Sequence, residues 1–180
     1  MTHSTPSPAQ DRVIVRPARP EDAAQIIAYA RAVFAEPGIN LITMADEFSP
    51  TTESEARMIS EMNRASNSLF LVAEDDGRIV GQLTLQGGKR RNVRHSATLG
   101  ITVGREHRGQ GVGRRLMEDA IAWARASGVV TRIELNVFVR NTNAIRLYES
   151  CGFVVEGRRR RAAHRDGEYL DDLVMALLLE

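Results

Sequence analysis

The 180-residue chain is 43% hydrophobic and carries 24 basic and 23 acidic residues, for a formal net charge of +1. A chain of this length can form one domain in which roughly 70% of the unfolded chain's surface becomes buried. The balanced charge gives no overall field that would attract nucleic acid or an anionic membrane, so neither is an expected partner.

Cysteine usage and hydropathy indicate the compartment. Cys151 is the single cysteine, so a disulfide within the chain is excluded and a reducing compartment is favoured. A buried structural thiol is the favoured role for Cys151, and a nucleophile is the alternative. No signal-like segment and no run of ~18 apolar residues is present. We therefore expect a soluble cytoplasmic protein without a metal.

The first third of the chain predicts a strand and two helices. Residues 1–11 are polar and contain proline, so we expect a disordered tail before a single domain over residues 12–180. Proline and two acids at positions 20–22 mark a helix start, and Pro37-Gly38 ends that helix. The expected elements are a strand at Val13–Val15, a helix through Phe34, a loop over residues 39–50 and a helix at Glu53–Ala65.

The rest of the chain alternates between strands and helices. Asp76-Gly77 is a strong signal for a hairpin turn, and Gly128 marks the end of a long amphipathic helix. Helical and alternating periods predict helices at Gly111–Ser127 and Thr142–Ser150, and strands at Leu69–Ala73, Ile79–Gln86, Val93–Val103, Arg132–Val139, Phe153–Ala163 and Tyr169–Leu179.

This order, β-α-α-β-β-β-α-β-α-β-β, predicts a single-domain mixed α/β fold. The helix at Gly111–Ser127 joins two strands and suits a right-handed crossover between parallel neighbours. We expect the sheet to be mostly antiparallel and flanked by helices.

A glycine-rich turn, Arg108-Gly109-Gln110-Gly111-Val112-Gly113, follows an apolar strand and opens the long helix. The first turn of a helix leaves backbone N–H groups without partners, and the positive end of its dipole favours an anion. Glycine lets an anion approach the backbone or supplies a positive φ. Arg108 and Arg114 add positive charge, so the turn is a candidate phosphate site, although many such turns only connect a strand to a helix.

The spacing of this turn narrows its identity. A Walker-type loop would need Gly-Lys-Ser/Thr, and a dinucleotide fingerprint would need G-x-G-x-x-G, whereas this turn has R-x-x-G-x-G. It resembles the acetyl-CoA pyrophosphate loop of the GNAT (Gcn5-related) N-acetyltransferases. A second segment, from Asn141 to Phe153, resembles the family signature N-x-x-A-x-x-L-Y-E-x-x-G-F. The resemblance extends from about Val13 to the C-terminus.

The resemblance implies an acetyl-CoA-dependent N-acetyltransferase whose two parallel strands splay apart to hold the cofactor. The tail, Gly167-Glu168-Tyr169 with Asp171-Asp172, resembles bacterial acetyltransferases that act on amino acids and similar small amines. A protein N-terminal acetyltransferase and a non-catalytic acyl-CoA sensor are the alternatives. The cofactor residues implied are Ile101, Thr102, Val103, Arg108, Gly109, Gln110, Gly111, Val112, Gly113, Arg114 and Asn141.

Amide formation needs an oxyanion donor, an acid for the leaving thiolate and a neutral amine. In the resembling enzymes a bulge in the strand matching Leu99–Val103 frees a backbone N–H for the oxyanion, so residues 101–103 are the candidates here. Tyr148 occupies the family's acid position in L-Y-E, and the alternative is a half-buried core tyrosine. Asn141 either caps the short helix or bonds the pantetheine arm of the cofactor.

The sequence does not identify the general base that would deprotonate the amine. The strand at residues 97–103, where many relatives carry an acid, has none here. Glu106 and His107 lie beside the glycine-rich turn and can titrate usefully, but a solvated acid and a loop histidine are the plainer interpretations. The amine could instead be bound by Glu47, Asp171 or Asp172, or its proton could leave through a water chain.

Two further segments have both a functional and a structural interpretation. The loop at residues 39–50 packs on the domain or, as in the resembling family, forms one wall of the acceptor site. The run Arg158–Arg161 lies in a predicted strand, where at most two of the four side chains share a face. A solvated or homodimer-facing strand is therefore favoured over a nucleic-acid site, although one arginine could pair with the carboxylate of an amino acid.

Overall fold

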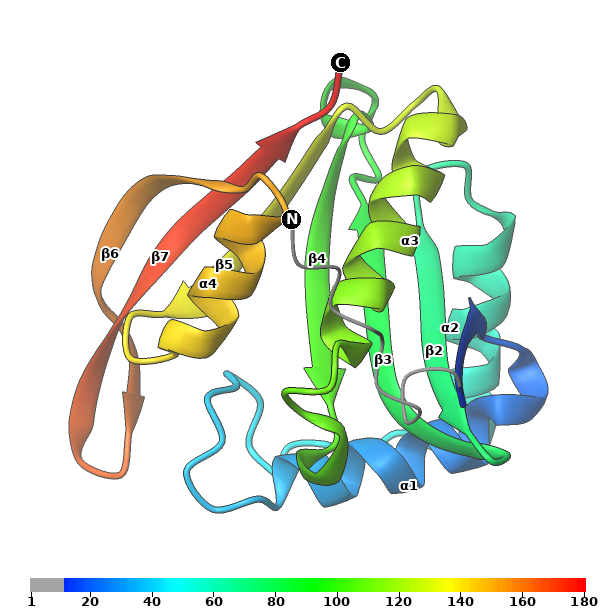
Figure 1. The fold of residues 1–180 in the computed structure, drawn as a ribbon, viewed down its shortest axis with the longest axis horizontal. Helices are drawn as coiled ribbons and strands as arrows, with labels where there is room; N and C mark the ends of the chain where they lie inside the picture. Colours follow the sequence, from blue (N-terminus) through cyan, green and yellow to red (C-terminus); the bar gives the residue numbers. More distant parts are fainter. Residues whose placement is uncertain (1–11) are drawn as a thin grey trace, which may run out of the picture.

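The computed structural model describes residues 12–180, so the tail expected at residues 1–11 lies outside the described residues. Seven strands form one sheet in the order β1-β2-β3-β4-β5-β7-β6. Only β4 and β5 pair in parallel, and all other neighbours are antiparallel (Figure 1). The strands are β1 (Val13–Pro17), β2 (Leu69–Asp75), β3 (Arg78–Gly87), β4 (Ser96–Val103), β5 (Arg132–Phe138), β6 (Val154–Arg165) and β7 (Glu168–Leu178).

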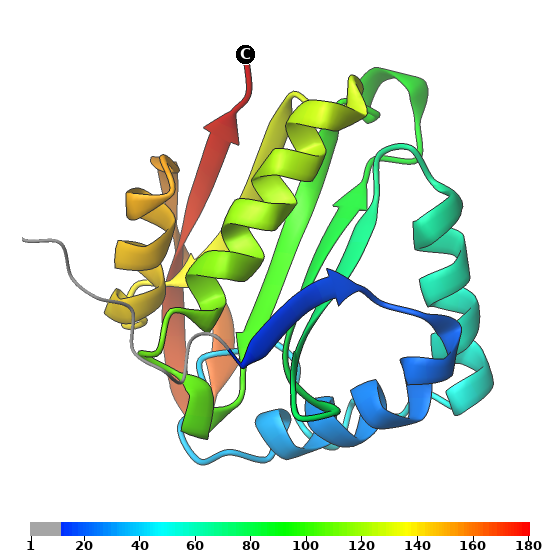
Figure 2. The ribbon, with the colours of Figure 1, turned by 45° about the vertical axis from the view of Figure 1, so that its right-hand side comes forward.

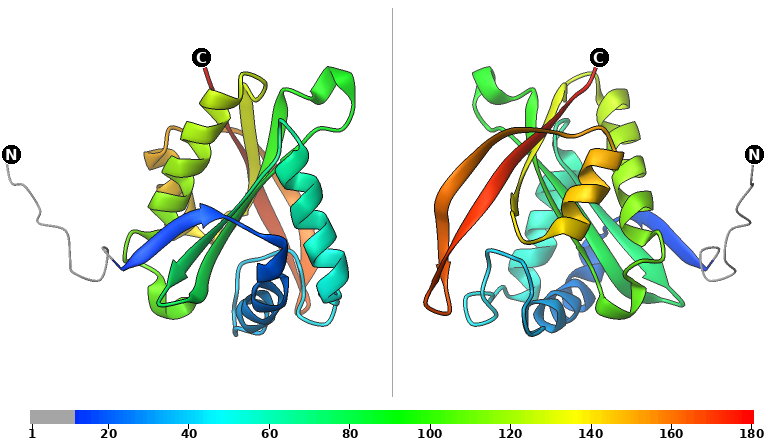
Figure 3. Two further views of the ribbon diagram at one scale, coloured as in Figure 1. Left: turned by 90° about the vertical axis from the view of Figure 1, so that its right-hand side faces the viewer. Right: turned by 60° about the vertical axis from the view of Figure 1, so that its left-hand side comes forward.

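Among residues 12–180, four α-helices pack on the sheet, and they lie in pairs on its two faces (Figure 3). The first pair is α1 (Ala23–Phe34) and α2 (Thr52–Arg64), and the second is α3 (Val112–Ser127) and α4 (Thr142–Ser150). Figure 2 shows α3 running along one face while α1 and α2 lie beyond the sheet. The chain therefore forms the mixed α/β fold predicted for it, a mostly antiparallel sheet flanked by helices. Among residues 12–180, no helix is long and apolar enough to cross a membrane.

Strand β2 packs against helices on both faces of the sheet. Its first five residues are all buried, and alternate side chains enter different hydrophobic clusters. Leu69 and Leu71 join the cluster that includes α3, whereas Phe70 and Val72 join the cluster that includes α1 and α2. Because side chains alternate across a strand, an unbroken apolar run is what a strand covered on both faces requires.

The turn chemistry predicted for the first hairpin is confirmed. Asp76 and Gly77 both have positive φ, at 50° and 74°, and join β2 to β3.

Thr51 caps α2 by accepting from the backbone N–H of Ser54, while the Ser54 hydroxyl oxygen accepts from the N–H of Thr51. These local bonds fix the start of α2 at Thr52, one residue before the expected start at Glu53.

The strand predicted from Val93 begins later, at Ser96. Residues 91–93 form a 3-10 turn instead. Asn67 donates to the carbonyl oxygens of Gly88 and Arg94, at 3.1 and 3.0 Å, and so holds the loop away from the sheet. The tertiary contact of a single asparagine thus overrides the β propensity of this segment.

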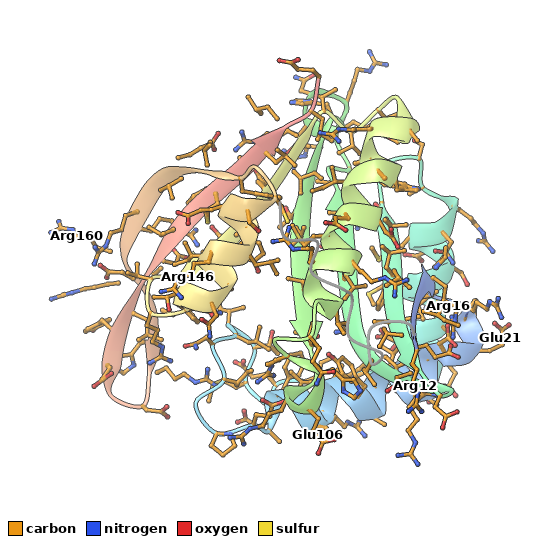
Figure 4. The ribbon with its side chains drawn as sticks, viewed as in Figure 1. Arg12, Arg16, Glu21, Glu106, Arg146 and Arg160 are labelled. Atoms are coloured by element: carbon orange, nitrogen blue, oxygen red, sulfur yellow. The ribbon has the colours of Figure 1, made fainter. Side chains whose placement is uncertain are left out.

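The alternation predicted for the arginine-rich strand is wrong in part. The pairing of β6 with β7 shifts register between Arg159 and Ala163, and Arg161 has a positive φ of 53°. A regular period of two therefore does not run through the four arginines. Arg158 and Arg159 bond to Asp171 and Asp172 on β7, and Arg160 points into solvent (Figure 4).

Candidate active site

The glycine-rich turn lies where β4 ends and α3 begins. Gly109 and Gly111 have φ of 72° and 84°, values that L-residues with a side chain rarely adopt. Gly111 is the N-cap of α3, and no described side chain caps it; the first intrahelical bond is from the N–H of Arg115 to the Gly111 carbonyl oxygen. The N–H groups of the first turn, at residues 112–114, are therefore oriented for an external acceptor.

Gly113 has a different role from its two neighbours, because its φ is not positive. A Cβ at this position would lie 3.2 Å from Leu147 Cδ2 and 3.7 Å from Val103 Cγ2. Its missing side chain thus allows α3 to approach α4 closely.

The charged and polar residues of the turn have partners of their own. Arg108 forms an ion pair with Glu36 at 2.7 Å and donates from Nε to the Val103 carbonyl oxygen at 2.8 Å. Arg114 donates to the Ser150 hydroxyl at 3.0 Å, and Gln110 donates to the Glu106 carbonyl oxygen. Both arginines predicted to add charge also lie beside an acid: Arg108 pairs closely with Glu36, whereas the half-exposed Arg114 makes only a long ion pair with Glu118, at 3.9 Å.

The two parallel strands, β4 and β5, pair over three residues and then diverge, which leaves a gap between them (Figure 1). Strand β4 pairs with β5 only over Ser96–Thr98, although it pairs with β3 along its length. The Ser96 carbonyl oxygen and the Gly104 N–H both bond toward β3. Because successive residues of a strand turn their backbone groups to opposite edges, those of Ile101 and Val103 face the gap.

The expected bulge in this strand is absent. The register between β3 and β4 runs without a shift from Gly81↔Val103 to Gly87↔Ala97. The divergence of β5, rather than a bulge, leaves the Ile101 backbone without a ladder partner on that side. Thr102 turns its backbone toward β3, and its Oγ1 accepts from the Tyr29 hydroxyl at 3.2 Å.

Tyr148 lies on α4, on the side of the gap opposite α3 (Figure 1). It is buried, and its ring contacts Phe153 with centroids 5.9 Å apart. Burial raises the pKa of Tyr148 to about 12. The phenol therefore carries its proton throughout the neutral pH range, as a proton donor must.

Asn141 is the N-cap of α4, as one of its two interpretations predicted. Its Oδ1 accepts from the N–H of Ala144 at 3.3 Å. This bond uses the amide oxygen, whereas the amide N–H groups take no part in capping α4.

Most of the residues considered as general base or as ligands of the amine have other partners or positions. Of the two candidates for the base, His107 bonds Asp75 at 3.2 Å, and Glu106 points outward from the lower edge of the molecule (Figure 4). Asp171 accepts from Arg158 and from the Arg161 N–H, and the buried Asp172 pairs with Arg159. Hydrogen bonds from Arg161 and Arg158 lower the pKa of Asp171, which weakens it as a base.

The loop at residues 39–50 contributes to two pockets. The first, here called the arginine pocket, has a volume of about 460 Å³. Arg140 donates from Nε to Asn40 Oδ1 at 2.7 Å, and Arg165 donates to the Ile39 and Leu41 carbonyl oxygens. Its lining residues are Glu36, Pro37, Gly38, Asn40, Met44, Arg140, Arg165 and Asp166.

The second pocket, here called the carboxylate pocket, lies between the loop, α1, α2 and the sheet. Its volume is about 480 Å³, inside the range of roughly 300–1,000 Å³ for small-molecule sites. Sequence reasoning missed its buried acid, Glu55, because an acid in the first turn of a helix is explained by capping alone. The pocket is lined by Ile26, Ala30, Glu47, Phe48, Ser49, Pro50, Glu55, Met58, Phe70, Gln82 and Thr84.

The fold and the site define an acyltransferase-like architecture, and comparison with known families agrees. The model of the acetyltransferase (GNAT) family matches residues 36–153, which is more than half of the chain. This chain therefore belongs to the GNAT family, as the two motifs predicted.

Individual relatives extend this result. L-amino acid N-acetyltransferase AaaT of Escherichia coli (strain K12) is 42% identical over 110 residues. That match covers 59% of this chain and 65% of the relative, so it spans less than two thirds of that protein's length.

Solved structures match nearly the whole chain. A GNAT-family acetyltransferase from Streptococcus pneumoniae is 32% identical with a TM-score of 0.90, covering 93% of this chain and 99% of its own. The Salmonella typhimurium protein yncA, solved with its cofactor acetyl-CoA, has a TM-score of 0.82 at 22% identity, covering 93% and 94%. The second likeness supports the fold.

Proposed function

We propose that this protein transfers the acetyl group of acetyl-CoA to the primary amine of an amino acid or an amino-acid-like compound. The observation that carries the proposal is the position of the uncapped first turn of α3 at the mouth of the gap between β4 and β5. An anion-binding turn beside an unpaired strand edge suits a ligand with a diphosphate and an amide-containing arm. The relationship to AaaT supports an amino-acid acceptor.

In this proposal the N–H groups of residues 112–114 bind the diphosphate, with Arg114 beside them. The exposed backbone of Ile101 and the N–H of Val103, whose carbonyl oxygen is occupied by Arg108, bond the pantetheine arm, and the amide of Asn141 can reach the same arm from α4. Gly109 and Gly111 supply the positive φ of the turn. Arg108 holds the turn to the end of β4 through the Val103 carbonyl oxygen rather than binding phosphate itself.

The chemistry then requires two groups at the reacting thioester. The Ile101 N–H donates to the oxygen on which negative charge develops, because it faces the gap without a strand partner. Tyr148 gives its proton to the departing thiolate. Its raised pKa keeps the proton on the phenol at neutral pH, so that the group is available as an acid.

The arginine pocket is the proposed site for the acceptor's carboxylate. Arg140 uses Nε on Asn40, and no other described residue bonds its terminal nitrogens. A planar guanidinium presented in this way binds a carboxylate through two parallel hydrogen bonds. The arginines of β6 that pair with Asp171 and Asp172 are committed to those acids.

A thiol-release assay with a panel of acceptors tests the function. Free amino acids should be acetylated faster than their amides, and Arg140→Gln should remove that preference by raising KM for the free acid about tenfold. Arg160→Gln, which changes an outward-pointing arginine, is the control. A preference for short peptides would favour the protein N-terminal acetyltransferase, and CoA binding without turnover would favour the acyl-CoA sensor.

Cytoplasmic location and a homodimer are further proposals that rest on the sequence. The absence of a disulfide partner for Cys151 supports a reducing compartment. Size-exclusion chromatography with light scattering measures the oligomeric state directly.

A further inference from the structure

Glu55 is an unusual acid on α2. Its side chain is among the few buried charged groups, with 6% of the residue exposed, and it lines the carboxylate pocket. Within residues 12–180 no group donates a hydrogen bond to its carboxylate. Its oxygens are not among the fully buried unpaired atoms of the described residues, so the carboxylate opens into the pocket while most of the residue is covered.

The electrostatics of Glu55 are those of a proton acceptor. Its place in the first turn of α2 would lower the pKa through the helix dipole, yet burial raises the pKa above its ordinary value of 4.5. Desolvation is therefore the larger effect. A carboxylate whose pKa moves toward neutrality becomes a stronger base at working pH.

A second polar atom in the same pocket also has no partner. Gln82 Oε1 is fully buried and accepts no hydrogen bond from any described residue. Gln82 and Thr84 lie on β3, where they face Thr102 and Gly100 of β4 in the sheet register. Strand β3, which forms the floor of the carboxylate pocket, is therefore the direct neighbour of β4, which carries Ile101. Neighbouring strands lie about 4.8 Å apart.

The one other titratable residue among those that line the pocket is Glu47. Its Oε2 accepts from the Met44 N–H at 3.0 Å, so it is held by the loop. The remaining lining residues are apolar or neutral, and none of them supplies a positive charge. A cation entering the pocket would therefore meet Glu55 as its unpaired counter-charge.

We propose that Glu55 is the general base of this enzyme: it takes a proton from the acceptor's ammonium group through a water that Gln82 Oε1 also binds. The proposal rests on the proposed acetyl transfer and supplies the base that the strand at residues 97–103 lacks. Two unpaired oxygen acceptors in one pocket are what an ammonium group or a bridging water needs as partners.

The proton balance is complete with groups already named. An N–H bond of the ammonium breaks and its proton moves to the Glu55 carboxylate, which leaves a lone pair on nitrogen. That pair forms the C–N bond as the C–S bond breaks, and the thiolate takes the Tyr148 proton. The second proton lost by nitrogen replaces the one that Tyr148 gave, and Glu55 releases its own to solvent.

The pH profile of kcat/KM for the acceptor tests the proposal, with Glu55→Gln as the variant and Glu61→Gln, an exposed acid on the same helix, as the control. At pH 7 Glu55→Gln should lose about 10²-fold. The loss should shrink above the pKa of the acceptor's amine, where the nucleophile is already neutral. A structural role would give a loss that does not depend on pH, and that result would overturn the proposal.

A binding measurement separates this proposal from the proposed function. In carbon-13 NMR of glutamate-labelled protein with CoA bound, n-propylammonium chloride should shift the Glu55 carboxyl signal and lower its pKa, and leave Glu61 unchanged. If the wild type acetylates no amine in the panel, the proposed function fails while this titration still reports on the ammonium site. An unshifted Glu55 signal at saturating probe rejects the site even where turnover is observed.

Discussion

Gly113 and Leu147 hold the two helices of the candidate site at a separation that only glycine allows without adjustment. A Cβ on Gly113 would lie 3.2 Å from Leu147 Cδ2. Gly113 is in the first turn of α3, and Leu147 precedes Tyr148 on α4. The proposed phosphate site and the proposed acid are therefore linked by one side-chain contact.

Adding a methyl group here tests that link. Gly113→Ala should keep the fold, because Leu147 Cδ2 is the end of a flexible side chain, at a cost of about 1 kcal/mol from overpacking. Combining it with Leu147→Ala removes the clash, so the double variant should lose less stability than the sum of the single losses, by about 0.5 kcal/mol or more. Additive losses measured by urea unfolding would mean that the contact is not strained.

The anion-binding role of the turn predicts a large effect at Gly111. Gly111→Asp places a negative charge at the cap of α3, where the free N–H groups point, so CoA affinity should fall more than tenfold, about 1.4 kcal/mol. Gly128→Asp is a matched control, since Gly128 also has a positive φ, of 64°, at the other end of α3. Calorimetry should show near-normal CoA binding for the control. Equal losses in both variants would indicate backbone strain rather than anion repulsion.

The proposed acid predicts a specific kinetic defect. A CoA thiol has a pKa near that of cysteine, roughly 8.5, so its thiolate can leave unaided and the acid should help without being indispensable. Tyr148→Phe should lower kcat about 10²-fold, which is about 2.7 kcal/mol of barrier. Because phenylalanine keeps the contact with Phe153, CoA affinity and thermal stability should change little.

The control for this variant is Tyr169→Phe, which removes an exposed phenol from β7. A large fall in thermal stability of Tyr148→Phe would show that the hydroxyl is structural. An unchanged kcat, with chemistry demonstrated as the slow step, would assign the acid role to another group.

The buried Glu55 carboxyl makes the stability of the folded protein depend on pH. Its raised folded pKa means that the folded state binds the proton more tightly than the unfolded state. The free energy of unfolding therefore falls as pH rises from the ordinary value of 4.5 toward the raised one. Glu55→Gln should be more stable than wild type at pH 7, by about 1 kcal/mol, and the difference should disappear near pH 4.

Thermal unfolding at both pH values measures this difference, and Glu61→Gln should show no such dependence on pH. A less stable Glu55→Gln at pH 7 would mean that the carboxylate makes a favourable contact in the folded protein. If Glu55→Gln is more stable than the wild type but less active, the glutamate contributes to function at the expense of stability.

Local sequence determined much of the fold. Helices α3 and α4, the hairpin at Asp76-Gly77 and the end of α3 at Gly128 follow from periodicity, positive-φ residues and caps, which act within a few residues of the chain. The same holds for the glycine-rich turn, because a helix N-terminus exposes its N–H groups wherever the helix packs. The order of the elements then limited the sheet to few topologies.

Tertiary structure decided what depends on residues far apart in the chain. Asn67 holds the loop before β4, so that β4 starts at Ser96 and not at Val93. Glu36 pairs with Arg108, and the divergence of β5, rather than the expected bulge, exposes Ile101. Glu55 is read as a helix-capping acid from sequence, and only packing against α1, β2 and β3 turns it into a buried, unpaired carboxylate. Residues distant in the sequence determine how a charged group is solvated and paired, so a local sequence pattern does not predict either property.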